Sequence, residues 1–389
     1  MKDLIQKYLN CIPLPSEELY NRFLHHKMSY LKMMENGFPL PDPESPGKVL
    51  LFNNNVFTRQ NNPEHQTCRC GKTLSMLDDK WYLDEGGCHY HLGKQLFVGP
   101  QYGLYTCCNT ASQGCAFNEH HVSFYRPFEE IKFVHTEEKK EEGSRKASNI
   151  FSIDCEMAFT TRGMEAVKTS LVSINGEVLY DSYVQPNNPI LDYNTAFSGV
   201  REEHLLQVTT QLEDVQAQLL RLLNKDSILI GHGVENDLLA LNLVHENVID
   251  TSFVFPHERG HPLKNSLKHL AQIYLHKHIQ DGYVGHNSIE DAKTCMELML
   301  WKIYSETRST FVARPRVPKP FIGNTFRANN FYPKYSIPYD PYKLASIFPP
   351  TFVCFQVAVT PPITPFVTAV CTTANYFPPM GNQWWPRLM

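Results

Sequence analysis

Two carboxylates, Asp154 and Glu156, follow an apolar run in the stretch 151–157 and are separated by one residue. Because side chains alternate across a β-strand, both acids would point to the same face of an extended segment. Two carboxylates so close together repel each other, and burial makes this costly unless a cation lies between them. The pair is therefore a candidate site for a hard divalent cation. The same pattern also occurs by chance at solvated strand ends, so this interpretation depends on partners elsewhere in the chain.

Two further acids and a histidine stand where such partners are needed. Asp237 opens a helix directly after a buried apolar run, and Asp291 lies in the first turn of the last helix, with Ser288 as a candidate N-cap and His286 in the preceding loop. Four converging carboxylates could hold two divalent cations ~3.5–4 Å apart, as in phosphoryl displacement, with an imidazole taking a proton from water. Taken singly, the two acids could be ordinary helix N-terminal residues, and His286 could be a surface histidine.

Cysteines and histidines crowd the segment 65–122. Thiolate and imidazole ligands together are typical of zinc, and a closed structural site uses four of them. The eight candidate ligands are Cys68, Cys70, Cys88, His91, Cys107, Cys108, Cys115 and His121. They could hold one or two structural zinc ions, although the irregular spacing does not decide which member of each neighbouring pair binds. The alternative is a group of free cysteines in a small core.

The composition is that of a globular protein of two or three domains. The 389-residue chain has a formal net charge of −4, which argues against a simple polybasic nucleic-acid binder but not against an enzyme that acts on nucleic acid. The first residues are mixed and charged, and no signal sequence is visible. We therefore expect the eleven cysteines in a reducing compartment, as metal ligands or core residues.

Shifts in composition divide the chain into five segments. We expect an N-terminal helical and extended segment at 1–60, a Cys/His-rich zinc-binding module at 61–125, a charged linker at 137–147, an α/β domain at 148–305 and a Pro- and aromatic-rich tail at 306–389. Prolines interrupt the most apolar part of the tail, so it does not predict a membrane span, and we expect it to be mostly disordered.

The order of elements in 148–305 predicts the fold of that domain. Three strands come first, with Asn175-Gly176 as a hairpin turn between the second and the third. Helices then alternate with short buried strands at 227–232 and 247–251. This order predicts an α/β domain with a mixed sheet flanked by helices, of the ribonuclease-H-like type. The acids and His286 fall at the ends of elements, where sheets of this kind place their ligands.

These motifs resemble a known group of nucleases. The stretches that carry the resemblance are 154–157, 192–200, 231–241, 250–252 and 286–292. They are similar to the three motifs of the DEDDh 3′–5′ exonucleases. The residues around these motifs resemble, more closely, the RNA exonuclease 1 homologue family, which includes the GOR-antigen proteins. Upstream, the run from Cys88 to His121 is similar to half of a CHORD-type zinc module. The resemblance covers about 150–304 densely and gives no information about the tail.

The resemblance implies roles for particular residues. Asp154, Glu156, Asp237 and Asp291 would hold two Mg²⁺ or Mn²⁺ ions, and His286 would be the general base in the release of nucleoside 5′-monophosphates from single-stranded RNA 3′ ends. The residues implied to contact the terminal nucleotide are Met157, Phe197, Ser198, Gly199, Val200, His204 and Asn236. The basic residues considered for phosphate contacts, with solvated surface charge as the alternative, are Lys168, Arg201, Arg259, Lys264 and Lys268. The resemblance also implies a nuclear location, with the cytoplasm as the alternative, and names no protein partner.

Three other functions compete with this one. A DNA 3′–5′ exonuclease would share the same catalytic residues, because discrimination rests on contacts to the 2′-OH. A catalytically spent RNA-binding scaffold would not require all five site residues. A zinc deaminase is disfavoured, because its His-x-Glu and Pro-Cys-x-x-Cys pattern is missing from the sequence.

Overall fold

The computed structural model describes residues 4–52, 66–74, 85–96, 103–111, 113–139, 146–280 and 285–312. All of them belong to one compact unit. Most of the predicted charged linker, and the predicted tail from 313 onward, lie outside the described residues. The first part of that predicted tail is helical, because the last helix continues to Val312, beyond the predicted domain boundary at residue 305.

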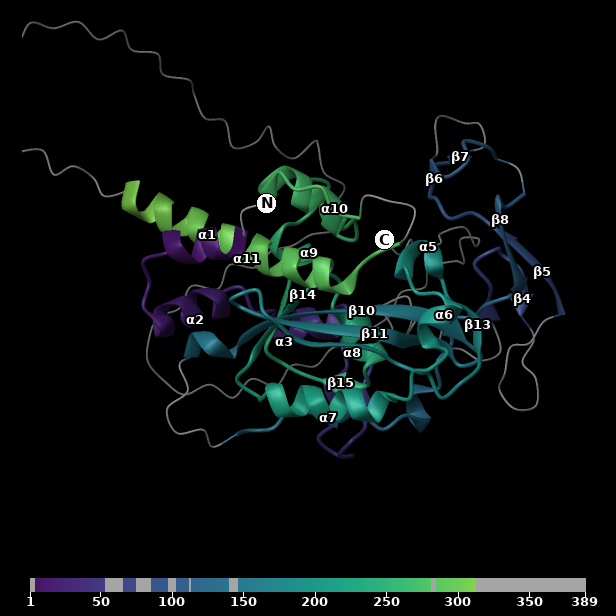
Figure 1. Ribbon diagram of the computed structural model, residues 1–389, viewed down its shortest axis with the longest axis horizontal. Helices are drawn as coiled ribbons and strands as arrows, with labels where there is room; N and C mark the ends of the chain where they lie inside the picture. The colour runs from purple at the N-terminus through teal and green to yellow at the C-terminus, as the bar shows by residue number, and fades with distance from the viewer. Residues whose placement is uncertain are drawn as a thin grey trace, which may run out of the picture. The chain divides into compact units, whose positions relative to one another are not determined.

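A six-stranded mixed sheet lies at the centre of the unit (Figure 1). Its strands are β10 (Ile150–Thr160), β11 (Gly163–Ser173), β12 (Val178–Tyr183), β13 (Ile190–Asp192), β14 (Ile228–Gly231) and β16 (Val248–Asp250). The order across the sheet is β12-β11-β10-β14-β16, and β13 pairs with β10. β10, β11 and β12 are antiparallel, whereas β10, β14 and β16 are parallel. This is the predicted mixed α/β sheet.

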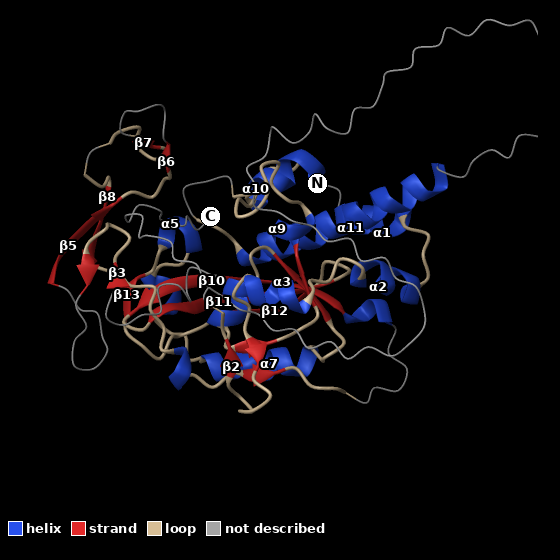
Figure 2. Cartoon of the chain, turned by 180° about the vertical axis from the view of Figure 1, so that it is seen from behind, coloured by secondary structure: helices blue, strands red, loops and turns tan. Residues whose placement is uncertain are grey.

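Helices cover both faces of the sheet (Figure 2). Ile228 and Ile230 of β14 belong to a core that also contains α11 (Ser288–Val312). Leu229, between them, belongs to a second core that contains α7 (Leu212–Leu222). This alternation follows from the period of two along a strand, and it explains why the predicted central strand is apolar throughout.

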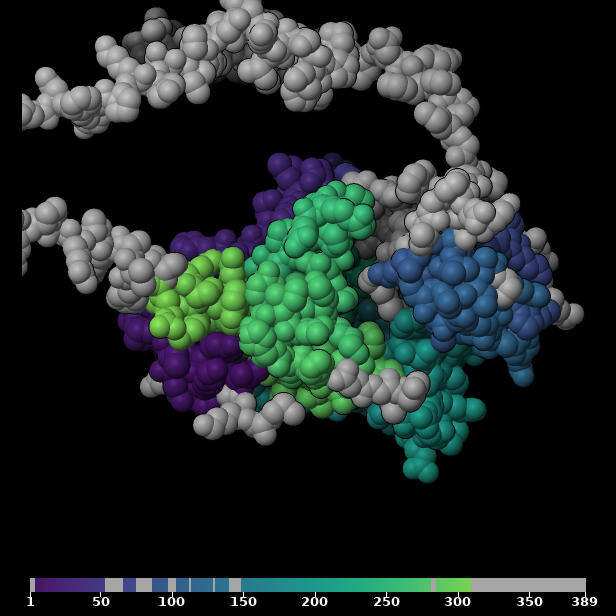
Figure 3. Space-filling view, turned by 90° about the horizontal axis from the view of Figure 1, so that it is seen from above, coloured from purple at the N-terminus to yellow at the C-terminus, as the bar shows by residue number. Residues whose placement is uncertain are grey.

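Three N-terminal helices complete these cores. They are α1 (Leu4–Cys11), α2 (Ser16–Leu24) and α3 (Tyr30–Glu35). Ile5 and Phe23 are buried in the core beneath α11, and Met33 is buried in the other core. Figure 3 shows N-terminal residues, in purple, directly against the yellow-green part of α11, which α1 and α2 contact. The N-terminal segment is therefore built into the α/β unit.

The Cys/His-rich segment forms three short antiparallel pairs, β3–β4, β5–β8 and β6–β7. Their strands are β3 (Gln66–Thr67), β4 (Thr73–Leu74), β5 (Glu85–Tyr90), β6 (Gln95–Leu96), β7 (Leu104–Tyr105) and β8 (Ala116–His120). Cys68, Leu74, Cys88 and Val122 form a small buried core that also contains Phe159 of β10. The segment therefore shares its core with the central sheet.

The remaining elements connect these parts. They are β1 (Leu40–Pro41), β2 (Val49–Leu50), β9 (Val134–His135), β15 (Leu243–Val244), α5 (Thr195–Ser198), α6 (Glu202–Leu205), α8 (Glu235–Ala240), α9 (Thr251–Val254), α10 (Leu267–Leu270), a π-helical turn at Ala271–Leu275 and 3₁₀ turns at Phe128–Glu130 and Lys146–Asn149. The segment 267–275 is thus a short α-helix, α10, that widens into a π turn. Among the described helices, none is long and apolar enough to cross a membrane.

The suggestion that Ser288 caps the last helix is wrong. The Oδ1 atom of Asn287 accepts hydrogen bonds from the amides of Ile289 and Glu290, at 3.0 Å and 3.4 Å, so Asn287 caps α11. The Ser288 hydroxyl lies 2.7 Å from that of Ser170 on β11. Because Ser288 faces the sheet, its side chain ties the helix start to the strand instead of closing the helix.

Because Phe23 is buried, its substitution tests whether the N-terminal helices contribute to the core of the unit. Phe23→Ala should lower the free energy of unfolding by about 3–5 kcal/mol, because it leaves a cavity between α2 and α11. Leu31→Ala is a matched control, since Leu31 is 64% exposed, and it should change stability by no more than about 0.5 kcal/mol. Urea denaturation measures both values. Equal effects from the two substitutions would show that the N-terminal helices do not share the core.

Candidate active site

Three of the predicted site residues meet where β10 passes α8. β10 carries Asp154 and Glu156, and α8 begins just after the neighbouring parallel strand β14. The amide of Cys155 donates a hydrogen bond of 2.7 Å to Oδ1 of Asp237, in the first turn of α8. The parallel pairing of β10 and β14 brings the two segments to one sheet edge, and this hydrogen bond fixes Asp237 beside the strand.

The start of α11 brings in the fourth carboxylate. The Ser152 hydroxyl of β10 donates a hydrogen bond of 2.7 Å to the carbonyl of Ala292. Asp291 precedes Ala292 and is only 2% exposed. With the contact between Ser288 and Ser170, this bond anchors the first turn of α11 to both β10 and β11. Asp291 is thereby held against the strand that carries the first two acids.

The four acids lie so close together that the negative charge of one destabilises the charged form of its neighbours. Burial, followed by the charges of its three neighbours, raises the pKa of Asp154 well above its ordinary value. Burial and the charge of Asp291 likewise raise the pKa of Glu156, and burial raises that of Asp237. Burial also raises the pKa of Asp291 to about 7, although a hydrogen bond from Gln280 opposes this. A divalent cation would remove this repulsion.

Two oxygens of the cluster are left without a hydrogen-bond partner although they are buried. They are Oε1 of Glu156 and Oδ1 of Asp291. A buried carboxylate oxygen without a donor is costly, and a cation can satisfy it. The donor set is entirely carboxylate, which suits hard ions such as Mg²⁺ and Mn²⁺ rather than softer metals. These residues therefore fit a divalent metal site.

His286 lies beside the fourth acid. Its Nδ1 atom is 3.6 Å from Oδ2 of Asp291, and the Gln280 amide nitrogen is 3.5 Å from Nδ1 and 2.8 Å from the same Oδ2. Burial, followed by the nearby charge of Lys268, lowers the pKa of His286. The imidazole is thus neutral at neutral pH, which is the form that a general base requires.

Sequence reasoning missed Gln280. This amide joins His286 to Asp291, yet it is a single residue in a loop, and the sequence carries no motif that marks it. Only the fold, in which the segment after the π turn meets the start of α11, places it there.

The residues predicted to contact the terminal nucleotide lie mainly in the loop from Phe197 to His204. The carbonyl of Phe197 accepts a hydrogen bond of 2.6 Å from the amide of His286, so this loop abuts the site. Gly285 packs against Gly199 so closely that a Cβ atom on Gly285 would collide with the Gly199 backbone nitrogen. The structure therefore brings Phe197 and Gly199 together with the predicted general base.

Other members of that set serve the local fold. Ser198 and Val200 are buried, and the Ser198 hydroxyl donates to the carbonyl of Tyr193. Nδ1 of His204 accepts a hydrogen bond from the amide of Arg201 and so closes the start of α6. Met157 follows Glu156 on β10 and is partly buried against a core, and the Asn236 amide donates to the carbonyl of Gly233. Their contact with a nucleotide stays a prediction.

The basic residues considered for phosphate contacts are mostly engaged within the chain. Four contacts show this: Lys168 with Asp181, Arg201 with Glu203, Lys264 with Glu235, and Lys268 with the carbonyl of Gln280. Arg259 is exposed in the loop after α9. Lys168 also lies close enough to Glu156 to favour its charged form.

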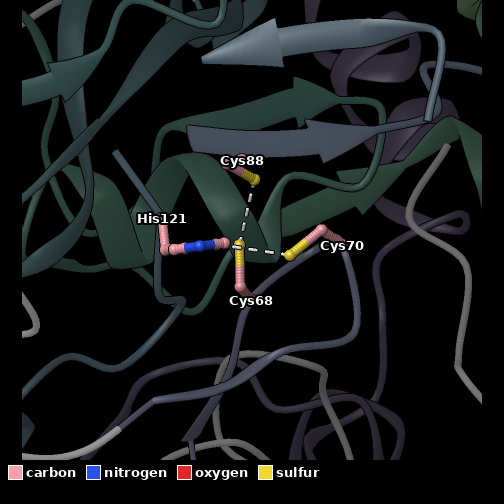
Figure 4. Close-up of side chains that lie close together, drawn as sticks. All are labelled: Cys68, Cys70, Cys88 and His121. Atoms are coloured by element: carbon pink, nitrogen blue, oxygen red, sulfur yellow. Dashed lines mark hydrogen bonds between the residues drawn. The ribbon is translucent and has the colours of Figure 1, made fainter. Parts of the chain in front are cut away.

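The eight predicted zinc ligands fall into two groups of four. In the first group, Cys68, Cys70, Cys88 and His121 place their ligand atoms within 4.8 Å of one another. Figure 4 shows their side chains pointing toward one centre. The sulfurs of Cys68 and Cys88 are 3.5 Å apart, and the sulfur of Cys70 lies 3.3 Å from Nδ1 of His121. Cys68 and Cys88 are fully buried. This candidate group thus contains both members of the Cys68/Cys70 pair and His121.

The second group is His91, Cys107, Cys108 and Cys115. Nδ1 of His91 lies 3.6 Å from the sulfur of Cys107 and 3.4 Å from that of Cys108, and the sulfurs of Cys115 and Cys107 are 3.4 Å apart. A hydrogen bond with Thr110 lowers the pKa of Cys108 to about 7. Both groups are compatible with a tetrahedral metal ion bound by thiolate and imidazole.

Comparisons with known proteins agree with this site. Residues 151–299 match the RNase_T family model, described as an exonuclease. The chain is 38% identical over 301 residues to the RNA exonuclease 1 homolog of Homo sapiens, a match that covers 76% of this chain and 25% of that protein. It is 40% identical over 291 residues to the exonuclease GOR of Pan troglodytes, which covers 73% of this chain and 42% of that protein.

The match extends over most of a third relative. The chain is 32% identical over 301 residues to RNA exonuclease 3 of Candida glabrata, covering 73% of this chain and 69% of that protein. By contrast, it spans less than half the length of the human and chimpanzee relatives. On this sequence identity and on the exonuclease match over the central sheet, the chain belongs to the family of RNA exonucleases that includes the RNA exonuclease 1 homologue and the GOR proteins.

Proposed function

We propose that the chain is a 3′–5′ exoribonuclease that releases nucleoside 5′-monophosphates from the 3′ ends of single-stranded RNA. The observation that carries this proposal is the convergence of four mutually repelling carboxylates, two of them with unpartnered buried oxygens, beside a neutral imidazole. Relatives named as RNA exonucleases support RNA as the substrate. A DNA exonuclease and a spent scaffold are the alternatives that the experiments below separate.

The chemistry is hydrolysis of the terminal phosphodiester. Asp154, Glu156, Asp237 and Asp291 would hold two Mg²⁺ or Mn²⁺ ions, which supply Lewis-acid stabilisation of charge on the reacting oxygens when bound. Because Nδ1 of His286 faces Asp291, Nε2 is the nitrogen that would take the proton from the attacking water. The 3′ oxygen of the preceding nucleotide would leave and become the new RNA end.

The Cys/His groups have a separate role in this proposal. Each group would hold one structural Zn²⁺ ion, giving two per chain. Both have four protein ligands, so neither would leave an open position for substrate. A segment of this size with so small a core needs such an ion for stability. The predicted nuclear location stays a prediction.

The Asp154→Asn variant tests the activity. The wild-type chain with Mg²⁺ should shorten a 5′-labelled single-stranded RNA one nucleotide at a time, EDTA should stop this, and Asp154→Asn should abolish it because one carboxylate ligand is lost. Asp226→Asn is the control, since Asp226 is exposed and outside the cluster. Digestion of a DNA strand of the same sequence, measured in parallel, distinguishes an RNA exonuclease from a DNA exonuclease. Absence of digestion by the wild type with both Mg²⁺ and Mn²⁺ would leave the scaffold alternative.

The same variant should stabilise the metal-free protein. Folding raises the pKa of the clustered acids, so the folded chain binds more protons than the unfolded chain near neutral pH. Stability should therefore fall as the pH rises from about 4, the unfolded value, through the pKa of about 7 for Asp291. At pH 7.5 in EDTA, Asp154→Asn should raise the Tm, whereas Asp226→Asn should not. A lower Tm for Asp154→Asn would contradict the predicted repulsion.

Metal analysis tests the two zinc groups. Protein purified without chelator should contain two zinc ions per chain. Cys88→Ser, in the buried group, should remove one ion and lower the Tm, because that group lies in the core shared with β10. Cys115→Ser, in the exposed group, should also remove one ion but should lower the Tm less. A wild-type content below one zinc per chain would rule out both sites.

A further inference from the structure

Arg69 stands between two ligands of the buried Cys/His group. It occupies the tight turn between β3 and β4, flanked by Cys68 and Cys70. The turn is closed by hydrogen bonds from the amide of Cys68 to the carbonyl of Lys72 and from the amide of Gly71 to the carbonyl of Cys68, both 2.8 Å. The backbone of Arg69 is therefore fixed on both sides.

The Arg69 side chain reaches two residues of the nuclease sheet, Phe159 and Asp192. Its guanidinium carbon lies 3.4 Å from the ring centre of Tyr90 and 5.2 Å from that of Phe159, on β10. The guanidinium also forms an ion pair with Oδ2 of Asp192. The two side chains are only 14% and 13% exposed, so solvent screens this pair poorly. A stacked and paired arginine of this kind is held in one orientation.

Asp192 links Arg69 to the loop that follows β13. It ends β13, whose pairing with β10 sets Asp192 opposite Phe159. The other carboxylate oxygen of Asp192, Oδ1, accepts a hydrogen bond of 2.7 Å from the amide of Asn194. Asn194 adopts the left-handed conformation, with φ of 52°, and α5 begins at the next residue. One carboxylate thus joins Arg69 to the start of α5.

The far side of the same loop holds the backbone of His286. The carbonyl of Phe197, in α5, accepts a hydrogen bond of 2.6 Å from the His286 amide. Gly285 packs so closely on the loop that a side-chain carbon there would lie 2.5 Å from the carbonyl oxygen of Thr195. Thr195 and Ser198 close the loop on itself through hydrogen bonds of their hydroxyls. A shift of α5 would therefore move His286.

We propose that Arg69 is a positioning residue for His286. It acts through Asp192 and the loop 193–199, so that the folded Cys/His turn sets the place of the imidazole beside Asp291. This rests on the proposed function only in taking His286 as the general base; the mechanical link stands on the contacts themselves. A displacement of about 1 Å at a reacting group can lower a rate by about 10²-fold.

Kinetics of paired substitutions test this link. Arg69→Gln and Asp192→Asn should each lower kcat on single-stranded RNA by about 10- to 100-fold, with KM within about twofold. Asp192→Asn keeps an oxygen for the Asn194 amide while removing the charge, and Arg69→Lys should recover part of kcat because it keeps the charge. Arg22→Gln is the matched control, since Arg22 pairs with Glu18 on the surface of α2 and should have wild-type kinetics.

The decisive comparison uses His286→Ala. If Arg69 acts through His286, Arg69→Gln should cause little further loss of kcat in the His286→Ala background, since the group that it positions is gone. An equal further loss in that background would overturn the proposal. So would a rise in KM with kcat unchanged, which would indicate that Arg69 contacts RNA instead.

A readout independent of catalysis keeps the link testable. Amide hydrogen exchange of wild type and Arg69→Gln should differ in peptides covering 193–200 and 285–291 and agree in α7. Zinc content and Tm establish that the Cys/His turn is intact, and Asp192→Asn or Arg69→Lys replaces any variant that fails this check. Faster exchange in the two loops supports the positioning role of Arg69 even if no RNA is cut, because in that case only the proposed exonuclease function fails. Unchanged exchange in both loops overturns the positioning role.

Discussion

The mutual repulsion of four carboxylates, held together at one sheet edge, governs the rest of this structure. Asp154, Glu156, Asp237 and Asp291 come from three elements that would separate if charge alone decided. Hydrogen bonds hold them in place: the Cys155 amide to Asp237, and the Ser152 hydroxyl to the first turn of α11. The repulsion is thus balanced by packing of the sheet and helices, and it creates a strong preference for a cation. The same feature that weakens the metal-free fold prepares it to bind metal.

The sequence predicts the fold, and the two acids of β10 as neighbours on one face, because both depend on local periodicity. The period of two in β10 places Asp154 and Glu156 together, and the apolar run of β14 identifies a strand covered on both faces. The candidate zinc ligands are predicted as a set, but the sequence does not divide them into their two groups. The reason is that the two groups are nested: the first spans Cys68 to His121 and encloses the second, from His91 to Cys115. Pairing of β5 with β8 produces this nesting, and spacing along the chain does not encode it.

Side-chain contacts that no local pattern encodes are what sequence reasoning missed. Gln280 reaches both His286 and Asp291, and Arg69 pairs with a residue 123 positions away. Neither belongs to a repeated pattern, so nothing in the composition or spacing distinguishes them from surface residues. The suggested Ser288 cap failed for a related reason. Local helix rules favour it, but the tertiary contact with Ser170 takes the hydroxyl, and Asn287 becomes the cap.

Strand β10 connects all these features, and its geometry explains why the Cys/His segment bears on the site at all. The strand begins at Ile150, in the core that contains α11, and carries two of the four acids at its middle. Near its end, Phe159 lies in the small core of the Cys/His segment, close to Arg69. The register of β10 with β11 shifts between Glu156 and Met157, because Val167 of β11 has no partner on β10 and β11 bulges beside the acids. Glu156 thus stands where the pairing of β10 with β11 is interrupted, so the position of its carboxylate depends on how the rest of β10 is held. The Cys/His segment packs against one end of β10 at Phe159, so its fold bears on the precision of the carboxylate site.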